Sequence, residues 1–130
     1  MLGDVPVFDM TLVAGEDLTN HMYKAVKLNA SGQAVKAVAG DGMWVLQNTP
    51  KVNAAAAVRV HGISFGYLTG AVTAGNRVTS DVTGGIVAAT KAGVAGAAIT
   101  GTTAIGIALK TGVVGDLIPI LMDRQEVSNT

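Results

Sequence analysis

Cysteine is absent from the 130 residues of the chain. Disulfide bonds, thiolate metal sites and cysteine nucleophiles are therefore all excluded. Histidine is scarce too: His21 and His61 are the only two, and they do not have the His-x-x-x-His spacing of a metal site. The acidic residues lie singly at expected turns, without the spacing of a calcium loop. We expect no metal and no cofactor.

Charge is also sparse, at 14% of residues, and nine Lys and Arg balance nine Asp and Glu. A neutral chain with scattered basic residues has no general attraction for polyanions, so we expect no nucleic-acid partner and no anionic membrane surface. The uncharged run Ala92–Leu109 is long enough to span a bilayer, but it consists mainly of Ala, Gly and Thr. We therefore predict that it is not a transmembrane helix.

Aromatic residues make up only 4% of the chain, and strong helix formers such as Leu, Glu and Gln are few. Seventeen glycines and many Val and Thr residues favour strands joined by tight turns. We predict an all-β fold, a small barrel or sandwich of short antiparallel strands with an extended N-terminal segment. Its core of Val, Ile, Leu and Ala buries little area per side chain, so it would gain stability from a partner surface.

Hydrophobic runs and turn residues place the expected strands. Met22–Leu28 and Ala34–Val38 form a hairpin around a Gly-containing turn, and Met43–Gln47 is a short buried strand. Val58–Leu68 is a longer strand with one bulky and one small face. Gly62 and Gly66 on the small face predict close backbone approach or a bend.

A short motif recurs later in the chain: a small residue, Gly, then Asn or Asp, then a strand. It occurs at Ala74–Val78 and Val114–Ile118, where Gly supplies a positive φ. The spacing is irregular, which indicates a local recurrence and not a true repeat. Pro119 predicts that the last strand lies at a sheet edge or that the proline stands at its start.

These elements divide the chain into three parts. Residues 21–123 form a single β domain, residues 124–130 form a polar tail, and residues 1–20 form an N-terminal arm or an edge strand. In the first alternative the apolar residues of the arm form an interface and become ordered on a partner protein. They are Val5, Val7, Phe8, Met10 and Leu12. In the second they belong to the domain's own sheet.

Gly62–Gly66 spells G-x-S-x-G, the nucleophile-elbow pattern, with His61 directly before it. That pattern needs a strand, a sharp turn and a helix inside a large α/β sheet. Here the alternation runs straight through Ser64, so the sequence predicts a small strand residue and no enzyme activity.

Three stretches carry a family resemblance: YKAVKLNASGQAVKAVAGDG, AVTAGNRVTSDVTGGIVAAT and IGIALKTGVVGDLIPILM. In their order of turns and strands they resemble the small capsid decoration, or cement, proteins of tailed bacteriophages. The resemblance covers most of residues 22–122 and includes no catalytic signature.

The resemblance implies a β domain on the outside of an icosahedral head, commonly a homotrimer, that clamps neighbouring subunits of the major capsid protein. Such a protein is made in the bacterial host cytoplasm and ends up on the exterior of the virion. Two alternatives stay open. One is another phage structural component, such as a head fibre or tail-tube protein. The other, less favoured, is a small-molecule-binding β-barrel.

Overall fold

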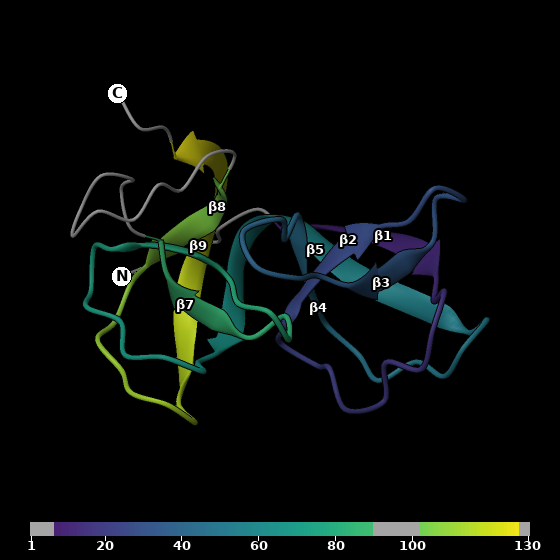
Figure 1. Cartoon of the computed structure of the whole chain (residues 1–130), viewed down its shortest axis with the longest axis horizontal. Helices are drawn as coiled ribbons and strands as arrows, with labels where there is room; N and C mark the ends of the chain where they lie inside the picture. Colours follow the sequence, from purple (N-terminus) through teal and green to yellow (C-terminus); the bar gives the residue numbers. More distant parts are fainter. Residues whose placement is uncertain (1–6, 90–101, 128–130) are drawn as a thin grey trace.

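The computed structural model describes residues 7–89 and 102–127, and every regular element in this part of the chain is a β-strand (Figure 1). This confirms the predicted all-β class of short antiparallel strands. The strands are β1 (Phe8–Val13), β2 (Ala25–Leu28), β3 (Ala34–Lys36), β4 (Trp44–Leu46), β5 (Ala55–Tyr67), β6 (Arg77–Ser80), β7 (Ile86–Ala88), β8 (Thr102–Ala108) and β9 (Leu117–Val127).

All strand ladders are antiparallel, and they join in the order β3-β2-β4-β5-β9-β8-β6-β7, with β1 added on β5. The long strand β5 connects the two ends of this sheet. Its first half pairs with β1 and β4, and its second half pairs with β9. In Figure 1, β5 accordingly runs between one lobe that holds β1 to β4 and another that holds β7 to β9.

The two lobes repeat one arrangement. In unit 1 (residues 8–61), the β2–β3 hairpin pairs through β2 with β4, which pairs with β5; in unit 2 (residues 62–122), β6–β7, β8 and β9 do the same. The registers match residue by residue. Ala25 lies opposite Val45, which lies opposite Arg59; Arg77, Ile107 and Leu121 form the equivalent row. The chain therefore contains a structural repeat.

Turn geometry supports the repeat independently. In the β2–β3 turn, the backbone N–H groups of Ser31 and Gln33 donate to Asn29 Oδ1 at 3.0 and 2.9 Å. In the β6–β7 turn, the N–H groups of the equivalent residues 83 and 85 donate to Asp81 Oδ1 at 2.8 and 2.9 Å. A short Asx side chain that accepts from the backbone two and four residues ahead fixes both hairpins.

Two apolar clusters form the core. The cluster of unit 1 includes Leu18, Leu46 and Val58, and the cluster of unit 2 is centred on residues such as Ile86 and Ile120. The second cluster also contains three residues of unit 1, which are Ala25, Ala37 and Val45. The outer side of the unit 1 sheet thus packs on the core of unit 2, so the two units share one interior.

Glycines permit the passage from one unit to the other. Gly62 has φ 99° at the point where β5 changes partners. Gly66 faces Ile120 so closely that an added Cβ would lie only 2.2 Å from its Cδ1. The sequence predicted a bend or a close approach at these two glycines, and both occur.

Two sequence-based expectations were wrong. The first was that the chain has no true repeat. The Gly-Asn/Asp motif itself is not the repeating unit, because both occurrences lie in unit 2, where Gly75 is equivalent to Tyr23 of unit 1 and Gly115 to Asn53. All four residues have positive φ, and a repeat with Gly in one unit and Tyr or Asn in the other is hard to see in sequence. The second was the edge position that Pro119 suggested: β9 is a central strand, and the proline is its third residue. The proline is tolerated because its nitrogen points toward β8 where that ladder ends, next to Leu109.

The ends of the described part extend the sheet. β9 continues to Val127, into the segment that the sequence assigns to a polar tail, and pairs there with β8. Within the run Ala92–Leu109, residues 102–108 form β8, while residues 92–101 lie outside the described residues. No helix in residues 7–89 and 102–127 could cross a membrane.

Candidate interaction surface

An apolar face lies on β5 and β9, on the side of the unit 2 sheet away from its core. Three directly opposed pairs form it, and we call it the β5–β9 face: Ile63 with Leu121, Phe65 with Pro119, and Tyr67 with Leu117. Phe65 is 51% exposed, Leu117 48% and Leu121 38%. The solvent side of an antiparallel sheet is ordinarily polar, so an uncovered apolar face on two central strands marks a contact surface.

The repeat supplies a comparison within the same molecule. The equivalent positions of unit 1, on β1 and β5, form the β1–β5 face: Asp9 with Arg59, Thr11 with Ala57, and Val13 with Ala55. This face consists of an ion pair and mostly small side chains. The same backbone arrangement therefore carries a water-compatible surface in unit 1 and an apolar surface in unit 2. Backbone architecture alone does not require the apolar residues.

The aromatic residues reinforce this contrast. None of the five aromatic side chains is fully buried, although aromatics bury more area than any other residue type. Phe65 and Tyr67 lie on the β5–β9 face. Tyr23 borders it, with its ring 5.8 Å from that of Phe65 in an edge-to-face arrangement. The ammonium of Lys24 lies 5.1 Å from the centre of the Tyr67 ring. A chain with few aromatics has placed three of them at one surface.

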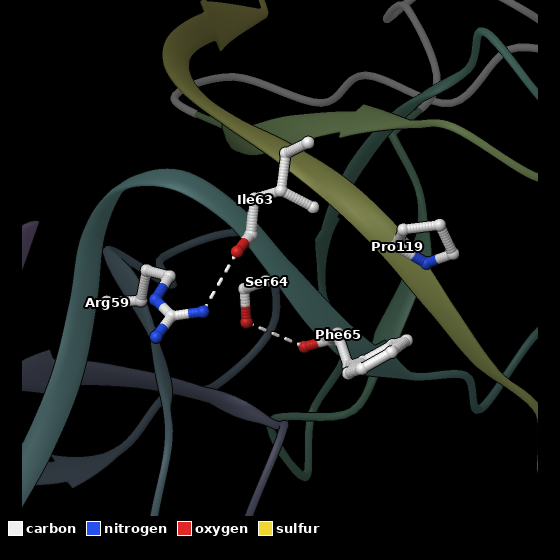
Figure 2. A pocket seen from close by; sticks show the side chains of 5 residues that line it. All are labelled: Arg59, Ile63, Ser64, Phe65 and Pro119. Atoms are coloured by element: carbon white, nitrogen blue, oxygen red, sulfur yellow. Dashed lines mark hydrogen bonds between the residues drawn. The ribbon is translucent and has the colours of Figure 1, made fainter. Parts of the chain in front are cut away.

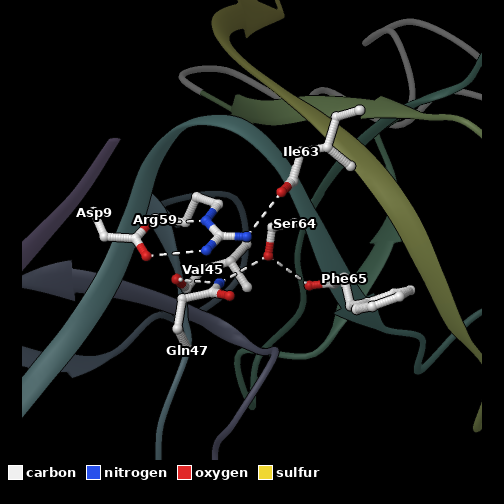
Figure 3. A network of polar contacts seen from close by, with 7 residues as sticks. All are labelled: Asp9, Val45, Gln47, Arg59, Ile63, Ser64 and Phe65. Carbon is white, nitrogen blue, oxygen red and sulfur yellow. Dashed lines mark hydrogen bonds and ion pairs between the residues drawn. The ribbon is translucent and has the colours of Figure 1, made fainter. Parts of the chain in front are cut away.

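A polar network stands beside this face (Figure 3). The Arg59 guanidinium donates to both carboxylate oxygens of Asp9, at 2.7 and 3.0 Å, and to the carbonyl oxygen of Ile63 at 2.9 Å. The hydrogen bonds from Arg59 hold the pKa of Asp9 below its ordinary value, and the same pairing raises the pKa of Arg59. The network ties β1 to the bend of β5 and leaves this ion pair mutually satisfied.

A shallow pocket of about 90 Å³ is lined by Arg59, Ile63, Ser64, Phe65 and Pro119 (Figure 2). Three of these residues belong to the β5–β9 face. Pockets for small-molecule ligands usually enclose roughly 300–1,000 Å³. This pocket is therefore of a size to receive one side chain of a partner protein, and it gives no support to the small-molecule-binding alternative.

Ser64, the central residue of the G-x-S-x-G pattern, is buried on a continuous strand. Its hydroxyl donates to the carbonyl oxygen of Phe65 at 2.8 Å and accepts from Gln47 Nε2 at 2.8 Å. His61, directly before the pattern, is exposed. The hydroxyl proton is thus held by a backbone carbonyl, and the strand, turn and helix that a nucleophile elbow requires do not occur here.

His21 is buried at the junction of the two units. Its Nε2 lies 2.6 Å from the carbonyl oxygen of Ala25, whose own N–H donates to Gly84 O. Burial lowers the pKa of His21, because the neutral ring loses less hydration than the charged one. The ring is therefore a packing element. Among the described residues no cluster of His, Asp and Glu could hold a metal ion.

The predicted N-terminal interface residues are divided between two environments. Met10 and Leu12 pack against the core of unit 1. Val7 and Phe8 are exposed at the start of β1, and Val5 lies outside the described residues. Residues 8–13 form β1, which pairs with β5 in the sheet.

The sequence interpretation missed the β5–β9 face as a site. It did identify Ile63, Phe65 and Tyr67 as one bulky face of a strand. The missing information was that Leu117, Pro119 and Leu121 lie directly opposite, which follows only from the pairing of β5 with β9. A sequence signal existed: β5 carries bulky residues opposite small ones, and residues 117–122 of β9 are apolar at every position, so both faces of that strand are apolar.

No protein-family model matches the chain, and no curated protein matches its sequence. A solved structure does match its fold. It is the head fibre gp8.5 N base of bacteriophage phi29. The match has a TM-score of 0.58 and covers 91% of this chain and 95% of that chain, at 13% sequence identity. The two proteins share a fold.

Proposed function

We propose that this chain is a structural protein of a bacteriophage head that binds the outer surface of the capsid and stabilises contacts between subunits of the major capsid protein. The observation that carries the proposal is the fold shared with the phi29 head fibre base along nearly the whole chain. The decoration-protein resemblance of residues 22–122 supports the same setting. A homotrimer is the assembly that this resemblance implies.

The described surface supports action by contact. Its most distinctive feature is an uncovered apolar face. Ser64 of the G-x-S-x-G pattern is buried, and its hydroxyl is engaged by a backbone carbonyl and a side-chain amide. A neutral protein has no long-range electrostatic steering, so shape and apolar burial must supply its affinity. Copies bound side by side on a shell would add many modest contacts into one strong clamp.

A head fibre base is the second candidate, favoured by the solved structure itself. The two candidates differ in what they do to the shell. A protein that clamps capsid subunits should raise the temperature at which heads break, whereas a fibre base needs only to bind.

The test is co-sedimentation of the purified chain with expanded, DNA-free heads of the phage that encodes it, followed by heating of the complexes. We expect saturable binding and a higher breakage temperature. Binding with an unchanged breakage temperature would favour the fibre base. Failure to bind expanded heads would contradict both candidates.

The exposed start of β1 allows a sharper variant. If Val7 and Phe8 contact the shell, Phe8→Asp weakens head binding at least about 10-fold, as expected when a contact aromatic is lost. Val82→Asp is the matched control, because Val82 is 74% exposed in the β6–β7 turn. Equal binding of the two variants would remove the N-terminal residues from the interface.

A further inference from the structure

We propose that the β5–β9 face is the surface on which a second copy of this chain docks. The proposal rests on the proposed function in one respect, namely that several copies act together. Its test, however, needs no capsid.

Folding of unit 2 does not by itself explain why the β5–β9 face is apolar. The pairs Ile63–Leu121, Phe65–Pro119 and Tyr67–Leu117 occupy positions that unit 1 fills with Asp9–Arg59, Thr11–Ala57 and Val13–Ala55. Both sets lie on the outer side of the same kind of antiparallel pair. Since unit 1 folds with polar and small residues there, folding of unit 2 does not need the apolar set. Burial against a partner explains the difference.

A second copy of the chain is the partner best suited to cover the β5–β9 face. Interfaces that form permanently between copies of one chain are more apolar than transient ones, and their centres are poor in charge. The six residues of the β5–β9 face carry no charge themselves. The Arg59 guanidinium beside the face is already paired with Asp9, and the Lys24 ammonium is engaged with the Tyr67 ring, 5.1 Å from its centre. A face whose own residues carry no charge offers a foreign protein few groups for specific recognition, but it suits a copy that presents the same apolar surface.

The β5–β9 face has a shape that can fit a second copy of itself. Phe65 protrudes from the face, and beside it lies the pocket of about 90 Å³ that Ile63 and Pro119 help to line. A protruding aromatic side chain next to a pocket for one side chain is the arrangement found at the energetic centre of protein interfaces. Each copy can therefore offer both a ring and a recess to its neighbour.

The experiment is sedimentation velocity of the purified chain over a range of protein concentrations. We expect an oligomer for the wild type and a monomer for Phe65→Asp and Leu117→Asp, whose dissociation constants rise at least about 30-fold. Thr11→Asp and Ala55→Asp are the matched controls, because they place the same charge at the equivalent exposed positions of unit 1. Both controls should stay oligomeric. Circular dichroism verifies that all four variants fold.

A second measurement uses the absence of cysteine and does not depend on a disruptive variant. Alkylation of the single thiol in Leu117→Cys should slow as protein concentration rises through the association range, while alkylation of Ala55→Cys should not. A wild type that stays monomeric at all concentrations would overturn the proposal. So would equal association of the test and control variants, or alkylation of Leu117→Cys that is independent of concentration. None of these results would bear on head binding.

Discussion

At the scale of single residues, the two units agree in backbone conformation where they disagree in sequence. Tyr23 and Gly75 are equivalent, with φ of 64° and 91°, and so are Asn53 and Gly115, with φ of 68° and 92°. Positive φ is easy for Gly, tolerated by Asn and rare for Tyr. The strand register on either side of these positions therefore dictates the conformation, and the residue accommodates it.

Gly115 allows this point to be tested without steric interference. An added Cβ would have no heavy atom within 4 Å, so Gly115→Ala changes only the backbone energy. We expect the free energy of unfolding to fall by about 1 kcal/mol, measured by urea denaturation. Asn53→Gly, at the equivalent position, should leave stability unchanged or slightly raise it. An alanine variant as stable as the wild type would argue against positive φ at residue 115.

Single residues also show how far the sequence could go. Positive φ at Gly75 and Gly115 was predictable, since Gly followed by Asn or Asp is a turn motif. Positive φ at Tyr23 and Asn53 was not, because neither residue prefers that conformation strongly enough to reveal it. The repeat was hidden at these two positions for that reason.

At the scale of elements, the two hairpin turns differ in one side-chain atom: Asn29 has an amide nitrogen where Asp81 has a second carboxylate oxygen. Asn29 accepts from two backbone N–H groups, whereas the Asp81 carboxylate accepts from those of Thr83 and Gly85 and from the hydroxyls of Thr69 and Thr83. Burial of Asp81 raises its pKa, but the hydrogen bonds together lower the pKa by more than burial raises it. The pKa of Asp81 therefore lies below the ordinary value of 3.8. The ionised form is stabilised by folding.

We expect Asp81→Ala to lower the free energy of unfolding by about 2–3 kcal/mol at pH 7, as for lost hydrogen bonds to a charged group. Asn29→Ala should cost about 1 kcal/mol, since its amide is neutral. A carboxyl group whose folded pKa is lowered stabilises the protein fully above its unfolded pKa and loses that effect as the pH falls toward the folded pKa.

The Asp81→Ala difference should therefore shrink below about pH 4, while the Asn29→Ala difference should not. Denaturant titrations at pH 7 and pH 3 measure both. A constant Asp81→Ala difference across this range would mean that the carboxylate charge contributes nothing to the turn.

Among the elements, the hairpins and β4 could be predicted because their signals are local: an apolar run, a Gly-containing turn and a second run. The pairing of β5 with β9 could not, because its partners lie fifty or more residues apart, as in Gly66 with Ile118. The edge assignment from Pro119 failed for the same reason. A proline needs only to avoid one ladder bond, and the end of β8 provides that place.

At the scale of the whole molecule, the sequence predicted the all-β class but not the repeat, and it missed the candidate site. The repeat places two contrasting surfaces, the β1–β5 face and the β5–β9 face, on the same backbone arrangement. Two units share strand order, register and turns, and one of them carries an apolar outer face. A protein built in this way can use unit 2 to join its copies while other surfaces, such as the exposed start of β1, contact the shell.

Electron cryomicroscopy of expanded heads incubated with the chain tests this account most directly. We predict added density on the outer surface of the shell that bridges neighbouring major capsid subunits, with Phe65 of each copy directed at another copy. Heads without added density, or with the chain inside the shell, would contradict the account.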